Sequence, residues 1–262
     1  MRSPLPSFLY LVACIVLFAR CGGSKPDETM SPEERFRLGM LEYGKKRYTE
    51  ALQHFDVIRL QFPGSPVADS ARFFSGMSRF ASEEYLLASY EFSHLLQYNA
   101  SHTLHADAQY MYARCFVELS PKSQLDQTYT FRAIDALQSF IENHPRDPRV
   151  AEAERTIRSL TEKLAKKEYE TGLLYLKLEN TRAAEVYFDN VFDKYYNTEY
   201  ADDALAMKIR ILMKRGKHAE AAPFIDLFLE KFPDSPYTGE VKGYRDFVTA
   251  HGFSADSRGQ RR

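Results

Sequence analysis

The chain has 262 residues, of which 44% are hydrophobic and 27% are charged, a balance typical of one or two globular domains. Its formal charge of −1 argues against nucleic-acid binding, because neutralising phosphates requires a clustered basic excess. The chain has no Trp, and its 17 Tyr and 19 Phe supply aromatic side chains for seams between helices.

The N-terminal residues 1–20 are predicted to be a secretory signal peptide. The apolar run Phe8–Ala19 is too short to span a bilayer but suits the hydrophobic part of such a signal. Cys21 follows directly and resembles the lipidated cysteine of bacterial lipoproteins. That pattern has a small residue before the cysteine, where this chain has Arg20. Cys14 is therefore kept as an alternative, and so is an ordinary secretory signal or an uncleaved anchor.

Residues 21–30 are predicted to be a lipid anchor followed by a polar tether. The first helix is then expected to begin at Ser31-Pro32-Glu33-Glu34, where Ser is placed to cap the helix and Glu34 to complete a capping box. The same arrangement predicts three further helix starts, at Ser65-Pro66, Asp147-Pro148 and Ser235-Pro236.

A cassette of about 37 residues recurs along the chain. Its first two copies are Gly39, Ala51, Phe55, Pro63 and then Gly76, Ala88, Phe92. Later copies are Gly172, Ala184, Phe188 and then Ile209, Ala221, Ile225, Pro233. Small residues where one helix approaches another, each followed by a large apolar residue one turn on, are the signature of stacked helix–turn–helix units. The cassette resembles the tetratricopeptide repeat, which implies an all-α, right-handed helical solenoid of five repeats plus a C-terminal cap helix.

The repeats predict ten helices and a cap, with two departures from the regular period. The first two pairs are expected at Pro32–Lys45, Tyr48–Gln61, Pro66–Ala81 and Glu84–Tyr98. Repeat three carries an insertion around Ser120–Gln124, and repeat four begins with a long helix, Pro148–Leu178. Repeat five is expected over Thr198–Phe232 and the cap over Tyr237–Ala250.

These boundaries group the chain into segments. We expect repeats one to three in residues 31–146. The long helix, repeats four and five and the cap follow in residues 147–252, and residues 253–262 are a disordered tail.

No catalytic constellation, metal site or cofactor site is predicted. His102 and His105 lie near Asp107, but surface histidines are the better interpretation of this short segment. Cys115 lies among apolar residues of a predicted helix and is interpreted as a small buried filler. An enzymatic function therefore has little support in the sequence.

The inner face of the first three repeats is rich in aromatic residues and Met. The side chains that this repeat pattern places there are Phe36, Met40, Tyr43, Phe73, Met77, Phe80, Tyr110 and Arg114. Such side chains on a concave surface predict an adaptable groove for an extended peptide. The alternative is that they pack between neighbouring helices.

The layout as a whole, over Ser31–Ala250, resembles the tetratricopeptide lipoproteins of the outer-membrane β-barrel assembly machinery. The local matches are Leu164–Glu170 and Tyr110–Tyr112 before Ala113. The resemblance implies a non-enzymatic scaffold, anchored by lipid to the outer membrane and facing the periplasm. It also implies two partners, the periplasmic domains of the barrel-forming subunit and the C-terminal segments of unfolded barrel precursors.

The resemblance also suggests where each partner binds. Barrel precursors typically end in an aromatic residue, so Arg114 is expected to meet their terminal carboxylate. The barrel-forming subunit is expected on the C-terminal repeats, and in repeat five we single out Lys208, Arg210, Lys214 and Arg215. For any one of these cations, a solvated surface position is the alternative interpretation.

Two other function classes remain open. One is a periplasmic tetratricopeptide adaptor of cell-envelope constriction, which shares the Phe-Pro-x-Ser-Pro turns but usually has a separate coiled-coil segment. The other is a ligand-capturing uptake lipoprotein, a class with longer chains and Trp-rich sites, whereas this chain has no Trp. Isolation of membrane partners would separate the three classes.

Overall fold

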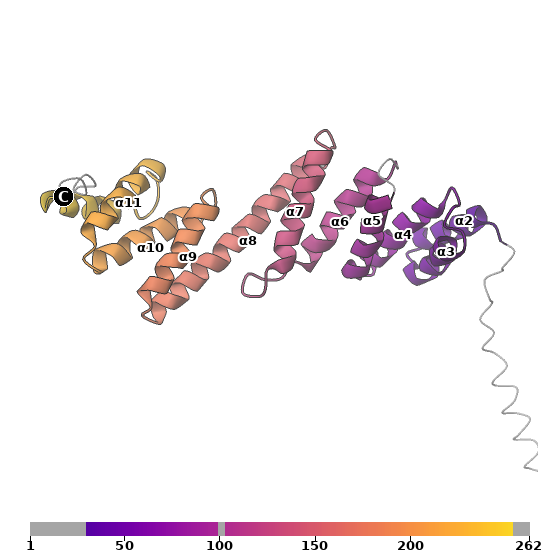
Figure 1. The fold of residues 1–262 in the computed structure, drawn as a ribbon, viewed down its shortest axis with the longest axis horizontal. Coiled ribbons are helices and arrows are strands. Elements are labelled where there is room, and N and C mark those ends of the chain that lie inside the picture. The colour runs from indigo at the N-terminus through magenta and orange to yellow at the C-terminus, as the bar shows by residue number, and fades with distance from the viewer. Residues whose placement is uncertain (1–29, 99–102, 254–262) are drawn as a thin grey trace, which may run out of the picture. The chain divides into compact units, whose positions relative to one another are not determined.

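The structure is a computed structural model and describes residues 30–98 and 103–253 of the chain (Figure 1). All regular structure in these residues is helical, and none of the described helices is long and apolar enough to cross a membrane. The predicted all-α fold of tetratricopeptide-type helix pairs is confirmed. The signal peptide, Cys14, Cys21, His102 and residues 254–262 lie outside the described residues.

The helices follow one another in the predicted order. Repeat one is α2 (Pro32–Gly44) with α3 (Tyr48–Gln61), and repeat two is α4 (Ala68–Ala81) with α5 (Tyr85–Tyr98). Repeat three is α6 (His105–Leu119) with α7 (Thr128–Asn143), and repeat four is α8 (Val150–Lys177) with α9 (Thr181–Lys194). Repeat five is α10 (Ala201–Lys214) with α11 (His218–Lys231), and α12 (Thr238–Ala250) is the cap.

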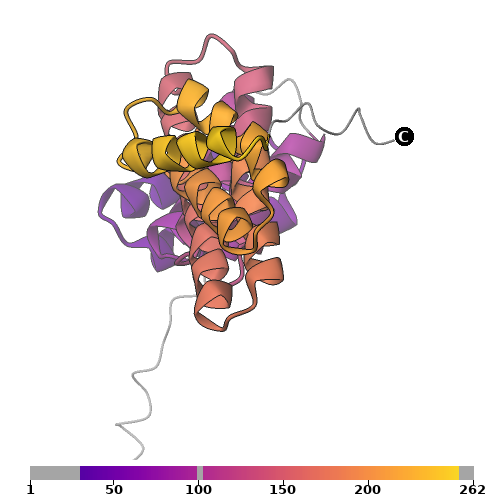
Figure 2. The same ribbon diagram turned by 90° about the vertical axis from the view of Figure 1, so that its left-hand side faces the viewer.

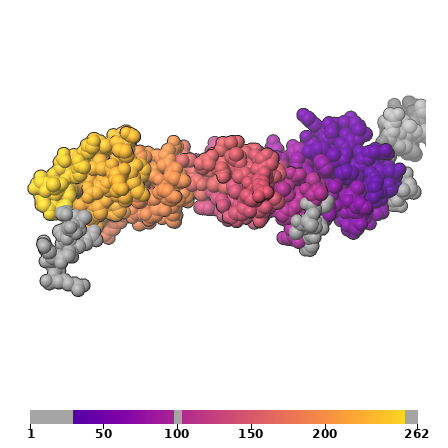
Figure 3. Space-filling view, turned by 90° about the horizontal axis from the view of Figure 1, so that it is seen from above, coloured from indigo at the N-terminus to yellow at the C-terminus, as the bar shows by residue number. Residues whose placement is uncertain are grey.

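These residues form two compact units. The first ends at Ser78 and the second begins at Arg79, within α4. In the second unit each helix from α5 to α12 packs against the next along the chain. Figure 2 looks onto the end that α12, in yellow, covers, and Figure 3 shows the surface of the second unit from magenta through orange to yellow.

The glycine and phenylalanine of the repeat cassette lie directly against each other. In the first unit a Cβ atom on Gly39 would lie 2.5 Å from the ring of Phe55, and in the second a Cβ on Gly172 would lie 2.7 Å from the ring of Phe188. Both rings are fully buried. Only glycine lets the two helices of a pair approach this closely, which is the physical reason for the recurring spacing.

Most pairs turn sharply between their two helices. Four repeats use one residue with a positive φ at this turn, namely Lys46, Glu83, Glu179 and Gly216. Gly216 adopts this conformation freely, whereas the other three residues carry a steric cost. Repeat three has the predicted insertion here instead, a loop over residues 120–127.

The helix-start prediction is correct at one of its four sites. Ser31 and Glu34 form the expected capping box at the start of α2. At the other three sites the helix begins two residues after the proline, and Ser65-Pro66, Asp147-Pro148 and Ser235-Pro236 form part of the preceding turn. The side chains of Asp147 and Ser235 there accept hydrogen bonds from the second residue after each, Arg149 and Tyr237. The Ser/Asp-Pro pair therefore marks a repeat boundary without capping these helices.

Candidate functional site

The predicted groove residues of the first unit are divided between core and surface. Phe36, Met40 and Tyr43 are half-buried and pack against the cluster formed by α2, α3 and α4. The ring centroids of Phe36 and Phe55 lie 5.7 Å apart, and those of Phe36 and Phe74 lie 6.0 Å apart. Phe73 is buried and Met77 is half-buried. Phe73 is therefore a core residue, whereas the other four side chains contribute to packing and still leave part of their surface open.

The predicted groove residues of the second unit are Phe80, Tyr110 and Arg114. Phe80 is half-buried, with its ring 5.2 Å from that of Tyr85. Tyr110 is buried against the ring of Phe140, 5.2 Å away, and burial raises the pKa of its hydroxyl. Tyr110 is therefore a core residue of repeat three.

The Arg114 guanidinium lies between two carboxylates. It is 2.9 Å from Glu118 on its own helix and 3.5 Å from Glu152 on α8. All three side chains are partly exposed, so the ion pairs are screened and weak. A peptide carboxylate would have to compete with both glutamates for this guanidinium.

Sequence reasoning missed an ion-pair cluster centred on Arg149. Its guanidinium lies 2.8 Å from Asp107 and 2.7 Å from Asp147, and it stands over the Tyr110 ring at 4.9 Å. Hydrogen bonds from Arg149 lower the pKa of Asp147 to about 2. The cluster joins repeat three to the start of α8. Its only sequence signal is the Asp-Pro-Arg that follows α7.

Three of the four predicted partner-binding cations of repeat five are engaged within the chain. Lys208 lies 2.6 Å from Asp189 and stands 3.6 Å from the centre of the Phe224 ring. Arg215 lies 2.8 Å from Glu185. These two pairs join α10 to α9, so both cations have a structural role whatever else they bind.

Arg210 makes the best-aligned ion pair of repeat five. Its Nε and a terminal nitrogen donate to the two oxygens of Glu240 on α12, at 2.9 and 2.6 Å. This hydrogen bonding lowers the pKa of the Glu240 carboxyl. Lys214, by contrast, is exposed and has no ion-pair partner within residues 30–98 and 103–253.

Arg210, Lys214 and Arg215 line a depression of about 510 Å³ between the end of α8 and α10. Its other lining residues are Leu176, Glu179, Thr181, Met207 and Ile211. The depression thus combines an apolar floor with a cationic rim, the usual make-up of a protein-binding surface. The structure places three of the predicted partner-binding residues here and leaves Lys208 outside it.

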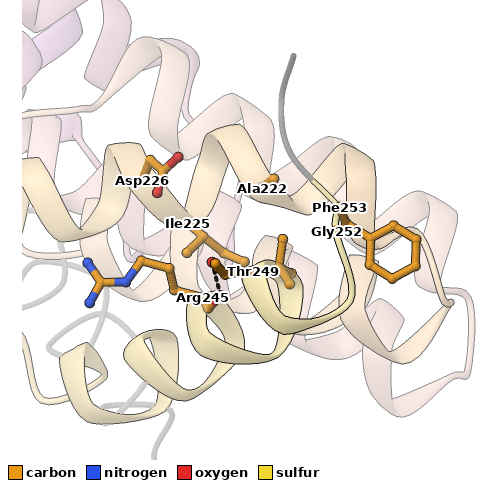
Figure 4. Close-up of a pocket in the computed structure, with 8 residues that line it drawn as sticks. Ala222, Ile225, Asp226, Arg245, Thr249, Gly252 and Phe253 are labelled. Carbon is orange, nitrogen blue, oxygen red and sulfur yellow. Dashed lines mark hydrogen bonds between the residues drawn. The ribbon is translucent and has the colours of Figure 1, made fainter. Parts of the chain in front are cut away.

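A second, smaller depression of about 240 Å³ lies between α11 and α12 (Figure 4). Ile225, Val248 and Phe253 contribute apolar side chains to its lining, and Asp226 and Arg245 contribute charged ones. No sequence pattern predicted this feature. It is smaller than the depression beside α10.

The described residues offer no sign of metal or thiol chemistry. They contain no cluster of His, Cys, Asp and Glu that could hold a metal ion. Cys115 is fully buried, and burial raises the pKa of its thiol to about 12, so it stays protonated and unreactive near neutral pH.

Comparison with known proteins gives a family match. Residues 28–227 match the sequence model of the YfiO family, described as outer membrane lipoprotein. The chain is 27% identical over 202 residues to the outer membrane protein assembly factor BamD of Rickettsia prowazekii (strain Madrid E), covering 77% of this chain and 80% of that one. It is 25% identical over 216 residues to BamD of Caulobacter vibrioides, covering 80% and 70%.

Solved structures with similar helix arrangements are tetratricopeptide proteins. A thermophilic TPR protein of Thermus thermophilus has a TM-score of 0.36 at 16% identity, over 84% of this chain and all of that one. A tetratricopeptide repeat protein of Parabacteroides merdae has a TM-score of 0.37 at 16% identity, over 85% of this chain and 74% of that one. These scores carry no weight for function, and the fold assignment rests on the helix pairs themselves.

Proposed function

The chain belongs to the YfiO family of outer membrane lipoproteins, and from this membership we propose that it is a non-enzymatic assembly factor for outer-membrane β-barrel proteins. The observation that carries the proposal is the extent of the match, residues 28–227, which runs from the tether almost to the end of α11. Two relatives, matched over 77% and 80% of this chain, bear the name of outer membrane protein assembly factor.

We further propose that Cys21 carries the lipid, with Cys14 as the alternative, and that the folded body faces the periplasm. Lasting attachment needs more than one acyl chain, since each buried methylene contributes only about 0.8 kcal/mol. A lipidated cysteine near the N-terminus supplies such an anchor. The helical body is then free to bind proteins beside the membrane.

The barrel-forming subunit is proposed to bind repeat five through its periplasmic domains. The depression beside α10 supports this placement, because Lys214 has no ion-pair partner among the described residues and the mostly buried Met207 and Ile211 line the depression next to it. Arg210 and Arg215 contribute their exposed edges while they remain paired with Glu240 and Glu185. Polar groups around an apolar centre give such a surface its specificity.

The C-terminal segments of unfolded barrel precursors are proposed to bind the aromatic residues of the first repeats. Within the first unit, the partly open surfaces of Phe36, Met40 and Tyr43 can contact apolar side chains of a peptide. Within the second unit, Arg114 can receive a terminal carboxylate in competition with Glu118 and Glu152. Weak, exchangeable contacts of this kind suit a client that must be released.

The placement on repeat five is tested with the full mature chain and the purified periplasmic domains of the barrel-forming subunit. Lys214→Glu should weaken the complex about tenfold in a calorimetric titration, because it reverses the exposed charge on the rim of the depression. Lys242→Glu is the matched control, since it makes the same charge change at an exposed site on α12. Equal affinities of the two variants for the partner would show that the partner does not bind at this depression.

A further inference from the structure

The long helix α8 carries a stripe of side chains spaced alternately by three and four residues. Its members are Ile157, Leu160, Leu164, Lys167, Thr171, Leu174 and Leu178, the last lying just beyond the end of the helix. This spacing keeps all seven on one face of a helix, as in a coiled-coil seam. The stripe runs nearly the whole length of α8.

The first half of the stripe is an interface within the chain. Leu160 is buried in the cluster that α6 and α7 form, and Ile157 packs against the same cluster. Leu164 is buried as well. Helix packing along this face is therefore already established in the structure.

The loop of repeat three contacts the middle of α8, next to the part of the stripe that α6 and α7 cover. Lys167 donates a hydrogen bond to the carbonyl of Leu125 in the loop, and Gln124 donates one to Glu170 at 3.1 Å. Lys163 donates to Ser120 Oγ at 2.8 Å. The loop thus sits against the middle of α8 and reaches no further than Glu170.

Beyond the loop the stripe is open. Leu174 is 54% exposed and Leu178 is 63% exposed, and Leu125 at the edge of the loop is 58% exposed. Helix α9 packs on a different face of α8, where Phe188 covers Gly172. We call Leu125, Leu174 and Leu178 the leucine strip.

The open strip is a consequence of the length of α8. This helix has 28 residues, whereas α10 has 14, so the preceding pair of helices covers only its first half. An exposed leucine side chain does not gain the favourable free energy of being removed from water. Exposed leucines that lie close together mark binding surfaces more often than isolated ones do. The strip continues a helix-on-helix interface for about two more turns, and the described residues leave it more than half exposed.

We propose that an amphipathic helix of a partner protein docks on the leucine strip and extends the packing that α6 and α7 begin. Continuity with that interface, at the same three-and-four spacing, favours a helix over an extended segment. Lys177 lies between Leu174 and Leu178 in the chain, is exposed, and has no ion-pair partner among the described residues. The docking helix should therefore present apolar side chains one turn apart with a carboxylate beside them.

A second copy of this chain is a poorer occupant. A stable dimer interface uses about 20 to 30 residues from each partner, and the strip offers three leucines. One helix of a partner protein can cover the three leucines as part of a larger interface between the two proteins. The leucines of the strip are not among the residues that line the depression beside α10, where the barrel-forming subunit is proposed to bind.

The test places a photoreactive residue in the strip of the full, membrane-anchored chain in cells. Leu178→p-benzoylphenylalanine should cross-link to one protein, at a segment that is helical in that protein and has apolar residues one turn apart with an acidic neighbour. Adding Leu174→Ser should lower the yield at least tenfold. The same probe at Val186 should give no cross-link to that segment, because Val186 is 59% exposed but lies on α9.

Several outcomes would overturn the inference. Cross-linking to a second copy of this chain, to this chain's own N-terminal residues, to lipid alone or to an extended segment would each do so, as would no cross-link at all. Folding is checked by circular dichroism of Leu174→Ser, which should match the parent because the leucine is more than half exposed. The cross-link should also persist in Lys214→Glu, which keeps this surface distinct from the depression beside α10.

Discussion

Repeats three and five place an arginine at the same repeat position, and each arginine reaches forward to the next first helix. Arg114 of α6 contacts Glu152 of α8 at 3.5 Å, and Arg210 of α10 contacts Glu240 of α12 at 2.6 Å. In repeat one the same position holds Met40. An arginine chosen from sequence as a ligand for a partner thus also joins one repeat to the next.

The two arginines differ in how firmly they are held. Arg210 makes two well-aligned bonds to one carboxylate, whereas Arg114 shares its charge between Glu118 and Glu152 with one long contact. A bidentate pair is stronger and more specific than two separate contacts. Arg114 is therefore the better placed of the two to exchange its partner for a bound carboxylate.

The largest expected effect tests whether the cores of repeats three and five are packed equally closely. Phe140 and Phe228 are fully buried at equivalent positions of α7 and α11. Each change to Ala should lower the free energy of unfolding by about 3–5 kcal/mol, because it leaves a large cavity. Urea unfolding followed by circular dichroism measures this. A cost below about 1 kcal/mol at either site would mean that the repeat is not closely packed there.

The next effect is on peptide binding, to which Arg114 is expected to contribute and Arg210 is not. Arg114→Ala should weaken binding of a peptide ending in Phe by about 1 kcal/mol, since the two glutamates already compensate part of the charge. Arg210→Ala is the matched control and should leave the peptide affinity unchanged. Fluorescence anisotropy with a labelled peptide gives both values.

An amidated peptide shows whether the carboxylate is the group that Arg114 meets. It should bind the parent chain as weakly as the free acid binds Arg114→Ala, with no further loss when the two changes are combined. Additive losses would contradict the contact. Phe73→Ala should also weaken binding of the peptide. If this change unfolds the first unit instead, the buried Phe73 ring belongs to the core and does not bind the peptide.

A smaller effect concerns stability rather than binding. Arg210→Met should destabilise the chain by about 1 kcal/mol because it removes a bidentate pair and leaves Glu240 with the Tyr244 hydroxyl but without the guanidinium. Arg114→Met should cost about 0.5 kcal/mol or less, since its contacts are looser. Thermal unfolding of both variants ranks them. The reverse order would contradict the interpretation that Arg210 is the firmer link.

The smallest effect is a difference in acid response between the two repeats. Arg149 lowers the pKa of Asp147 to about 2, so its stabilising contribution is present above the ordinary pKa of 3.8 and is lost as pH falls through about 2. Burial raises the pKa of Asp203 on α10, so protonation there favours the folded state as pH falls.

The variants Asp147→Asn and Asp203→Asn separate these two responses. Asp147→Asn should be less stable than the parent at about pH 7, and the difference should disappear as the pH falls through about 2, whereas Asp203→Asn should not lose stability at about pH 7. Unfolding curves across this pH range check both. A deficit of Asp147→Asn that persists at the acid end would contradict the ion pair as its cause.

Much of the fold could be predicted because its determinants are local. Gly39 and Phe55 meet for the reason that their spacing suggests, and the extra residues of repeats three and four fall where the period breaks. The helix starts at Ser65 and Ser235 were wrong, since backbone turns there replace side-chain caps. Capping depends on the φ and ψ of the turn, which a two-residue pattern does not determine.

The site was harder to predict because it depends on pairs distant in sequence. The sequence picks out Arg210 and Arg215 as cations but gives no sign that Glu240 and Glu185 already bind them. Likewise, the Arg149 cluster and the exposed face of α8 depend on how entire helices pack against each other, which the sequence pattern does not specify. Lys214 is exposed and has no ion-pair partner in the part of the chain that the structure describes, and its role in binding a partner stays a prediction.

The most direct test of the assembly role is to deplete the chain in cells and measure how much of a β-barrel protein reaches its folded form in the outer membrane. The folded form resists unfolding in a cold detergent gel and is therefore counted separately from the unfolded form. We predict that depletion lowers the folded fraction severalfold and that the full chain restores it, whereas the chain with Cys21→Ser restores it poorly. An unchanged folded fraction after depletion would contradict the assignment of this chain as an assembly factor.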